Sequence, residues 1–364
     1  MCKLEFAVVA QTAWCGVGAG EAIVKAINAG IWLLSAALFV VLPGAAAQAQ
    51  NEGARLDVSQ YFAAKDYPQT ANFPGGVIMT TVTYSTLPGF RPLTMDVYKP
   101  AGDAVHPGLV FIHGGNWNGG TSRSETPFGD FPGVLAAIAA HGYVVMSPNY
   151  RLSSEAKFPA ALIDSKAAIQ YFRAHARDYH LDADHVASWG ASAGGYLAVM
   201  VGLTCGVAAF EPSHDATQPV TSDCVQASID WSGLLVLEHM FTDFGKPMPA
   251  TSVEGAFLGC EPNACPAEIL RLANPMTYVG DKSPPMLIQH GDADAQIPTN
   301  QPQDLYNALR ARSVRAEFVI YRNSAHMFTN PNRAQNGSAA DPVNDQAALD
   351  KVVQFLDATF PQKK

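Results

Sequence analysis

The stretch SWGASAGGYLAVM, residues 188–200, places a serine between alanines and glycines and then continues as an apolar run. One interpretation makes Ser192 the polar cap of a helix, because a serine oxygen there accepts a backbone N–H. The other makes the pattern G-x-S-x-G, from Gly190 to Gly194, a tight turn between a strand and a helix that presents the hydroxyl as a nucleophile. Short glycine motifs also arise by chance, so the flanking sequence must distinguish the two.

Short apolar runs recur on both sides of this stretch, and helix-forming segments separate them. Such runs are typical of strands buried on both faces of a sheet. They are GLVFIHGG (108–115), GYVVMSPNY (142–150), HVASWG (185–190), VQASIDW (225–231), PMLIQHG (285–291) and AEFVIYRN (316–323). Two earlier segments, VIMTTVTYST (77–86) and LTMDVYKP (93–100), are predicted to pair as antiparallel strands. The alternation of strands and helices predicts an α/β fold with a mostly parallel central sheet and helices on both faces.

Two of the helices are marked by their first residues. One is predicted to begin at Pro159, because proline suits the first helical position. The last is predicted to begin at Asp341-Pro342, with the aspartate as its cap. The predicted buried stripes are Leu162, Ile169 and Phe172 on the first helix, and Leu349, Val352, Val353, Leu356 and Phe360 on the last.

Chemically active residue types follow four of the predicted strands, at the carboxyl edge where ligands bind in such sheets. A serine, an acid and a histidine occur in that order along the chain. The Ser192 hydroxyl needs a base to take its proton, and His326 is the candidate. An aspartate would hold the imidazole ring and stabilise its charged form. Asp292 and Asp294 both follow the same strand, and the residues alone leave the choice between them open.

The loop HGGNW, residues 113–117, follows an earlier strand and is a candidate oxyanion hole. Such a site needs two backbone N–H donors aimed at the developing negative charge. The N–H of Ala193, directly after the serine, is one candidate, and those of Gly115 and Asn116 are the others. His113 is expected to orient this loop rather than carry protons. Trp117, beside the loop, is a candidate substrate contact.

These motifs, taken together, resemble the acetyl-esterase and feruloyl-esterase branch of the α/β-hydrolases, near the hormone-sensitive-lipase group. The matching segments are HGGNW (113–117), WGASAGG (189–195), HGDADAQIP (290–298) and NSAHMF (323–328). The resemblance covers residues 77–360 and implies the α/β-hydrolase fold. It also implies Ser192 as nucleophile, His326 as base and Asp294, the fifth residue of H-G-x-x-D, as the acid. Asn116 departs from the family by replacing the third glycine of the oxyanion loop.

The resemblance implies a secreted carboxylic ester hydrolase that works through an acyl-serine intermediate. The expected substrates are short-chain, acetyl or feruloyl esters, as small molecules or linked to a polysaccharide. A serine peptidase or amidase of the prolyl-peptidase type is an alternative, since it uses a similar triad. A non-catalytic hydrolase-like binding module is another, although such modules usually lose a member of the triad. We expect no cofactor and no metal.

The first part of the sequence has the character of a targeting segment. Residues 1–49 are predicted to be an export signal, cut after Ala47-Gln48-Ala49, and our hypothesis is that residues 1–23 are a start-site artefact. The apolar core, residues 31–42, is short for a membrane span, so we expect no stable membrane anchor; an uncleaved anchor is the alternative. Residues 50–75 are predicted to be an N-terminal segment, and 76–364 the catalytic domain. The expected localisation is secreted or periplasmic.

The net charge and the cysteine content indicate which partners this protein is expected to bind and in which cellular compartment it folds. The formal net charge of −9 and the lack of a basic run argue against nucleic-acid binding. Four cysteines outside the export signal predict two disulfides. The local pairing, Cys205–Cys224 with Cys260–Cys265, is favoured because each bond closes one surface loop, but sequence alone permits the other pairings. A zinc site is disfavoured because no histidine stands at ligand spacing nearby. The oligomeric state is not predicted.

Apolar residues between Trp231 and Pro284 have two interpretations. They are Met240, Phe241, Phe244, Met248 and Phe257. They form either an apolar wall of the substrate site or the core of a small excursion from the sheet.

Overall fold

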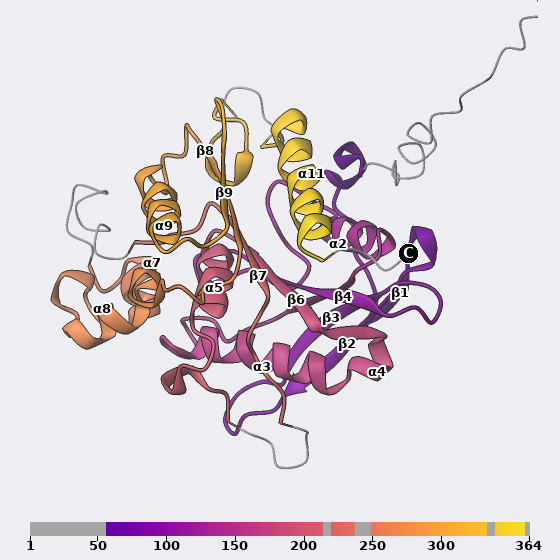
Figure 1. The fold of residues 1–364 in the computed structure, drawn as a ribbon, viewed down its shortest axis with the longest axis horizontal. Coiled ribbons are helices and arrows are strands. Elements are labelled where there is room, and N and C mark those ends of the chain that lie inside the picture. The colour runs from indigo at the N-terminus through magenta and orange to yellow at the C-terminus, as the bar shows by residue number, and fades with distance from the viewer. Residues whose placement is uncertain (1–55, 214–219, 237–248, 333–338, 361–364) are drawn as a thin grey trace, which may run out of the picture. The chain divides into compact units, whose positions relative to one another are not determined.

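The computed structural model describes residues 56–213, 220–236, 249–332 and 339–360. The predicted export signal lies outside these residues, as do Met240, Phe241, Phe244 and Met248. In the described part of the chain, nine strands form one sheet in the order β1-β2-β3-β5-β4-β6-β7-β8-β9 (Figure 1). They are β1 (Thr70–Asn72), β2 (Ile78–Ser85), β3 (Leu93–Lys99), β4 (His106–Ile112), β5 (Val144–Pro148), β6 (Leu181–Ala191), β7 (Ala227–Trp231), β8 (Met286–Gly291) and β9 (Ala316–Tyr321).

The six predicted core strands, β4 to β9, are all present and pair in parallel. The two earlier segments form β2 and β3, which pair antiparallel as predicted. Strand β3 joins the parallel strands by an antiparallel pairing with β5. The α/β fold with a mostly parallel sheet is therefore confirmed, and all six carboxyl ends of the parallel strands meet at one edge.

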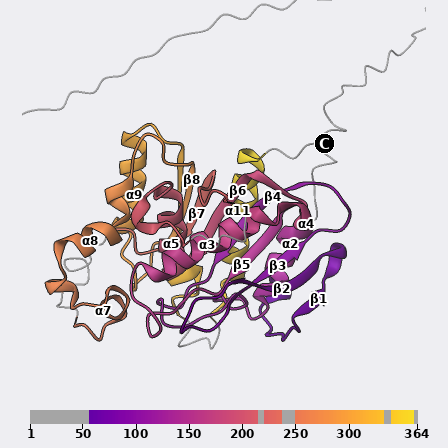
Figure 2. The same cartoon turned by 90° about the horizontal axis from the view of Figure 1, so that it is seen from below.

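Helices cover both faces of this sheet (Figures 1 and 2). They are α2 (Phe131–Ala140), α3 (Ala160–Ala174), α4 (Ala176–Tyr179), α5 (Ala193–Leu203), α7 (Val253–Leu258), α8 (Ala267–Ala273), α9 (Asn300–Ala311) and α11 (Pro342–Thr359). Six 3-10 helices are also described: η1 (Val58–Tyr61), η2 (Pro74–Gly76), η3 (Ala208–Phe210), η5 (Pro262–Ala264), η6 (Pro275–Tyr278) and η7 (His326–Phe328).

Alternate side chains of each central strand enter opposite cores, because successive residues of a strand point to opposite faces. On β4, Phe111 joins the core under α2 and α11, whereas Val110 joins the core under α3 and α5. A third apolar cluster lies between α5, α9 and strand β8. The continuous apolar runs in the sequence are the consequence of this burial on both faces.

The predicted helix signals are largely borne out, with small differences. Asp341 caps α11, and its side chain accepts the N–H of Asn344. The first predicted helix, α3, begins at Ala160, with Pro159 at the cap position. On α11 the buried stripe includes Phe355, which was not predicted, while Val353 is only half-buried.

The N-terminal segment carries structure that the sequence did not predict. Within the predicted N-terminal segment, residues 50–75, Thr70–Asn72 forms β1 and extends the sheet beside β2. Val58 of η1 is buried in the main core, and its N–H bonds to the side chain of Gln346 in α11. Part of the N-terminal segment is therefore a strand of the sheet.

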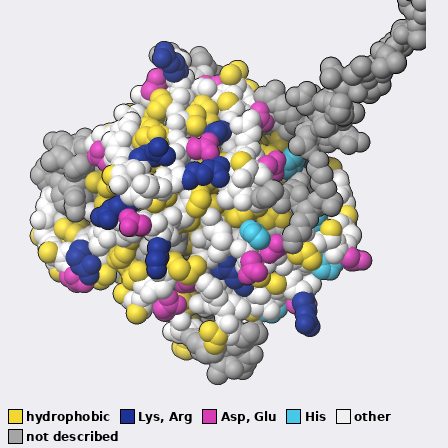
Figure 3. Space-filling view, in the orientation of Figure 1, with side chains coloured by type: hydrophobic (Ala, Val, Ile, Leu, Met, Phe, Trp, Pro, Cys, Tyr) yellow, Lys and Arg dark blue, Asp and Glu magenta, His cyan; other side chains and the backbone are white. Residues whose placement is uncertain are grey.

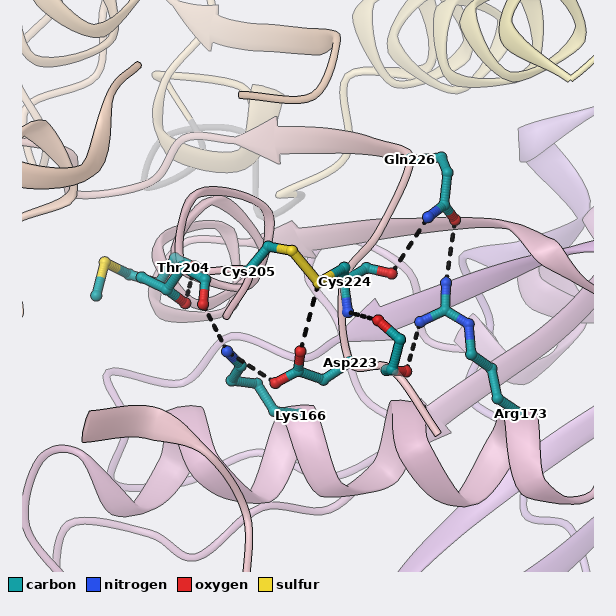
Figure 4. Close-up of a disulfide and its surroundings, with 9 residues drawn as sticks. Lys166, Arg173, Thr204, Cys205, Asp223, Cys224 and Gln226 are labelled. Atoms are coloured by element: carbon teal, nitrogen blue, oxygen red, sulfur yellow. Dashed lines mark hydrogen bonds and ion pairs between the residues drawn. A yellow bond between two sulfur atoms is a disulfide. The ribbon is translucent and has the colours of Figure 1, made fainter. Parts of the chain in front are cut away.

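Two disulfides are present, with the local pairing that the sequence favoured. Cys205 bonds to Cys224, and Cys260 bonds to Cys265. The first lies beside a fully buried ion pair, in which the Lys166 ammonium is 2.8 Å from an Asp223 carboxylate oxygen (Figure 4). Lys166 also donates to the carbonyl of Thr204, the C-cap residue of α5. The end of α5 is therefore held by a covalent bond and a buried charge together.

Three further findings concern the described residues. None of their helices has the length and apolar character needed to cross a bilayer. They contain no cluster of three or more histidine, cysteine or acidic side chains that could hold a metal ion. On the face shown in Figure 3, basic and acidic side chains are interspersed.

Candidate active site

The turn between β6 and α5 holds Ser192 in a strained backbone conformation. Its φ is 53° and its ψ is −119°, outside the regions that residues with a side chain favour. The Ser192 N–H donates to the carbonyl of Trp231 at the end of β7, which fixes the turn. A Cβ on Gly190 would lie 2.0 Å from the Gly194 carbonyl oxygen, and one on Gly194 would lie 1.9 Å from that of Ile112. Both glycines of the motif are therefore required by close backbone packing.

The Ser192 side chain meets a histidine rather than the helix that it precedes. Its Oγ lies 2.9 Å from His326 Nε2. On the other side of the ring, His326 Nδ1 lies 2.8 Å from Asp294 Oδ2. Among the described residues, no N–H of α5 donates to the Ser192 side chain. The structure thus brings together the three side chains that the sequence singled out, in the order serine, histidine, aspartate.

Asp294 is held as an ionised acceptor by its surroundings. Its Oδ1 accepts the backbone N–H groups of Gln296 and Ile297, at 2.8 and 2.9 Å. Burial raises the pKa of the Asp294 carboxyl, but the hydrogen bond from His326 and the charges of His326 and His290 outweigh it, and the pKa lies below its ordinary value. The carboxylate can therefore orient the imidazole and stabilise its charged form.

The other candidate acid, Asp292, has a different partner. Its Oδ1 accepts the N–H of Asn323, at 2.6 Å, on the loop that leads to His326. Asp292 therefore ties the two loops together and does not contact the imidazole. The geometry therefore distinguishes Asp294, which contacts His326, from Asp292, which contacts Asn323. The residue pattern alone left the choice between them open.

His290 lies behind Asp294 and was not singled out by the sequence. Its Nε2 is 2.8 Å from the Ile297 carbonyl oxygen and 3.4 Å from Asp294 Oδ2. Burial lowers the pKa of His290, although the Asp294 charge opposes this shift. The buried ring braces the acid-bearing loop from within the sheet.

The loop after β4 places exposed backbone next to the serine. Gly115 and Asn116 are exposed, with φ of 105° and 57°. Asn116 adopts the left-handed conformation that asparagine tolerates better than most residues, so it can stand where the family pattern has glycine. Within the described residues, no acceptor is found for the backbone N–H of Gly115, Asn116 or Ala193. These three predicted donors are available to an external oxygen.

Strained residues gather around the same edge of the sheet. Non-glycine residues with positive φ on the loops that follow β4, β6, β7 and β9 are Asn116, Trp117, Ser192, Ser232, Asn323, Met327 and Phe328. Such conformations cost free energy and persist where the surrounding structure imposes them, often at functional sites. Their concentration makes this edge of the sheet the candidate site.

Trp117 is packed inside the protein rather than along an open wall. Its ring is 4% exposed, stacks on Phe257 at 4.3 Å between centroids and meets Tyr196 edge-on. The Tyr196 hydroxyl in turn donates to the carbonyl of Ala273 in α8. In this structure Trp117 therefore joins the oxyanion loop to α5 and to the α7–α8 excursion. Phe257, the one described member of the proposed apolar wall, belongs to the same buried cluster.

His113 supports the loop, as the sequence suggested. Its ring is buried, stacks on Tyr150 and has Nδ1 2.7 Å from the Gly114 carbonyl oxygen. Burial lowers the pKa of His113 to about 4, so the ring is neutral at neutral pH. The Tyr150 hydroxyl donates to the His113 carbonyl at 3.0 Å. The contact with the Gly114 carbonyl, the stacking on Tyr150 and the hydrogen bond from its hydroxyl together fix His113, the first residue of the oxyanion loop.

Known proteins share this sequence pattern and this fold. The sequence model of the BD-FAE family matches residues 95–309. Esterase LipC of Mycobacterium tuberculosis is 30% identical over 67% of this chain, and the chain spans only 57% of the length of that relative.

Solved structures agree with these matches. Esterase 2 of Thermogutta terrifontis, phosphorylated by paraoxon, is 26% identical, with a TM-score of 0.61 over 80% of this chain and 97% of that one. A bifunctional GH43-CE protein of Bacteroides eggerthii is 28% identical, with a TM-score of 0.60 over 73% of this chain and 36% of that one. Because the family match covers more than half of the 364 residues, the chain belongs to the BD-FAE family and shares the α/β-hydrolase fold with serine esterases.

Proposed function

We propose that this protein is a carboxylic ester hydrolase in which Ser192, His326 and Asp294 act as a catalytic triad. The observation that carries the proposal is the unbroken line of contacts from Ser192 Oγ through the His326 ring to Asp294 Oδ2. It lies at the N-terminus of α5 and beside backbone N–H groups for which the described part of the chain offers no acceptor. A strained serine with a neighbouring base and free donors is suited to acyl transfer.

The first step forms the acyl-enzyme. Ser192 Oγ attacks the ester carbonyl carbon while its proton passes to His326 Nε2. The carbonyl oxygen becomes an oxyanion, which the N–H groups of Ala193 and of Gly115 or Asn116 stabilise. The bond from carbon to the alcohol oxygen then breaks, and His326 returns the proton to the departing alcohol. Asp294 holds the ring and offsets the charge of the imidazolium throughout.

The second step releases the acid. A water molecule attacks the acyl carbon of acyl-Ser192 and gives its proton to His326 Nε2. Collapse of the second oxyanion breaks the bond to Ser192 Oγ, which takes the proton back from His326. The products are one carboxylic acid and one alcohol, and the enzyme returns to its starting state.

The substrate class within this chemistry is an acetyl, short-chain or feruloyl ester, free or linked to a polysaccharide. Two relatives support it by their own names, since one solved structure is described as a carbohydrate esterase from gut microbiota and LipC is named an esterase. Two functions compete with ester hydrolysis. One is hydrolysis of amide bonds, as in serine peptidases, and the other is binding of a ligand without turnover.

Export from the cytoplasm is part of the proposal. Two disulfides support it, because such bonds persist in oxidising compartments. The export signal proposed for residues 1–49 lies outside the described residues and is tested by sequencing the N-terminus of the exported protein.

The test is a substrate panel on the mature protein and on Ser192→Ala. The panel contains p-nitrophenyl esters of increasing chain length, methyl ferulate, acetylated xylan and a peptide p-nitroanilide. We expect ester turnover in the wild type and a loss of about 10⁴-fold or more in Ser192→Ala, since removing a triad member leaves only binding and the oxyanion hole. Turnover of the anilide alone would indicate a peptidase, and full activity in Ser192→Ala would remove the proposed mechanism.

A further inference from the structure

A buried glutamate lies beneath the oxyanion loop. Glu125 follows that loop by a few residues and is 9% exposed. Its Oε2 accepts the backbone N–H of Gly114 at 2.8 Å, and its Oε1 accepts that of Thr126 at 3.1 Å. The nearby sequence, TSRSETPFG (121–129), has no periodicity that would single out this residue.

Glu125 has no cationic partner within the described part of the chain, so an ion pair does not explain its burial. Burial raises the pKa of its carboxyl to about 8, and the two backbone N–H groups oppose the rise. The neutral His113 ring and the Tyr150 hydroxyl belong to this loop and its neighbour. Arg123, two residues before Glu125, forms its ion pair with Asp96 instead. A buried carboxyl without a cation is costly, so the hydrogen bond to Gly114 is the feature that accounts for its position.

Gly114 is fixed between this carboxyl and the nucleophile turn. A Cβ on Gly114 would lie 2.9 Å from the carbonyl oxygen of Ala191, which directly precedes Ser192, and 3.2 Å from Glu125 Oε2. The oxyanion loop and the three residues after it contain glycines at 114, 115, 119 and 120, and glycine-rich backbone has many accessible conformations. An external acceptor for the Gly114 N–H therefore restricts the peptide that leads into the Gly115 donor.

We propose that Glu125 is a positioning residue, which holds the oxyanion loop against the nucleophile turn through the Gly114 N–H. The role rests on the proposed esterase function. It predicts that loss of the acceptor at residue 125 weakens stabilisation of the oxyanion more than it weakens substrate binding. It also predicts that the acceptor, rather than the negative charge, is what the loop requires.

The experiment compares Glu125→Ala, Glu125→Met and Glu125→Gln with the wild type. Methionine keeps the side-chain length without the acceptor, and glutamine keeps an amide oxygen that can accept the Gly114 N–H. The measurements are kcat and KM for p-nitrophenyl acetate, and the inhibition constant of 2,2,2-trifluoroacetophenone. This ketone forms an oxyanion adduct with a catalytic serine, so its affinity reports on the oxyanion hole.

We expect kcat to fall by about 10- to 100-fold in Glu125→Ala and Glu125→Met, with KM within about threefold, as for a partly lost oxyanion donor. The affinity for the ketone should fall by a similar factor. Glu125→Gln should stay within about fivefold of the wild type in both measurements, because its amide oxygen replaces the carboxylate acceptor.

Asp130→Ala is the matched control. Asp130 is also buried and accepts a glycine N–H, that of Gly133, but it does so at the start of α2. This variant should lose stability while keeping kcat and the ketone affinity.

Two results would overturn the role of Glu125. One is a wild-type kcat in a folded Glu125→Ala or, if alanine prevents folding, in Glu125→Met. The other is a Glu125→Gln variant as impaired as Glu125→Met. A wild type that hydrolyses no ester would instead overturn the proposed function, and with it this role. A wild-type kcat and ketone affinity in every folded Glu125 variant would contradict the Glu125 proposal alone.

Discussion

At the scale of single residues, Ser192 occupies the position of a helix cap without acting as one. It is the N-cap residue of α5, yet its hydroxyl contacts His326 instead of a helix N–H. The cap interpretation and the nucleophile interpretation of residues 188–200 therefore place Ser192 at the same position and differ in where its side chain points. The motif predicts the position, but only the fold brings His326 across 134 residues of sequence to the hydroxyl.

The two aspartates of the HGDAD segment give a residue-scale prediction. Asp294→Asn should lower kcat by about 10³- to 10⁴-fold, because the amide cannot hold the imidazole in the required tautomer. Asp292→Asn should change kcat little, since the asparagine oxygen can still accept the N–H of Asn323. Both variants are compared by initial rates with p-nitrophenyl acetate at saturating substrate. The reverse pattern would assign the acid to Asp292.

Single residues also show which parts of the candidate site could be predicted from the sequence and which could not. Ser192, His326 and Asp294 belong to motifs with fixed spacing, so the residue pattern and the family resemblance locate them. Glu125 and His290 act through burial and through contacts to backbone atoms, and neither feature leaves a local pattern. Trp117 was singled out because it adjoins the oxyanion loop, and its neighbours Phe257 and Tyr196 come from distant segments that bury it.

At the scale of elements, long apolar runs predicted the sheet well, and short elements were missed. Strands β4 to β9 are recognisable because burial on both faces removes polar residues from them. Strand β1 has only three residues, and a pattern of that length carries no periodicity. On α11 the stripe was predicted with Val353 where Phe355 is more deeply buried, because packing against the sheet and η1 decides between neighbouring positions.

The end of α5 gives the element-scale prediction. Lys166→Ala should lower the free energy of unfolding by about 3 to 5 kcal/mol, because it leaves the buried Asp223 carboxylate without its partner. A matched surface variant, Lys351→Ala, breaks a half-exposed pair with Glu317 and should cost at most about 1 kcal/mol. Urea unfolding followed by tryptophan fluorescence measures both. Equal losses in the two variants would contradict the importance assigned to the buried pair.

At the scale of the whole molecule, buried acids predict how stability changes with pH. Burial raises the pKa of Asp230, Asp345 and Glu125 to about 8 each. In the folded state these groups keep a proton that the unfolded chain releases above its own pKa of about 4. Their contribution therefore favours folding at low pH and is lost as the pH rises from about 4 to about 8.

Asp345→Asn tests this dependence away from the triad. Each such group contributes a slope of up to about 1.4 kcal/mol per pH unit, and asparagine does not titrate. The free energy of unfolding, measured in urea at pH 5, 6.5 and 8, should fall less steeply in Asp345→Asn than in the wild type. Parallel pH profiles would show that Asp345 does not retain its proton in the folded protein.

The disulfide between Cys205 and Cys224 has a practical consequence for producing this protein. The bond joins residues next to Thr204 and Asp223, the two partners of the buried Lys166 (Figure 4). A chain made in a reducing cytosol would have to bury this ammonium before any covalent link holds its partners in place. Expression hosts with an oxidising compartment should therefore give higher yields of folded enzyme, and thiol reductants should be left out of purification buffers.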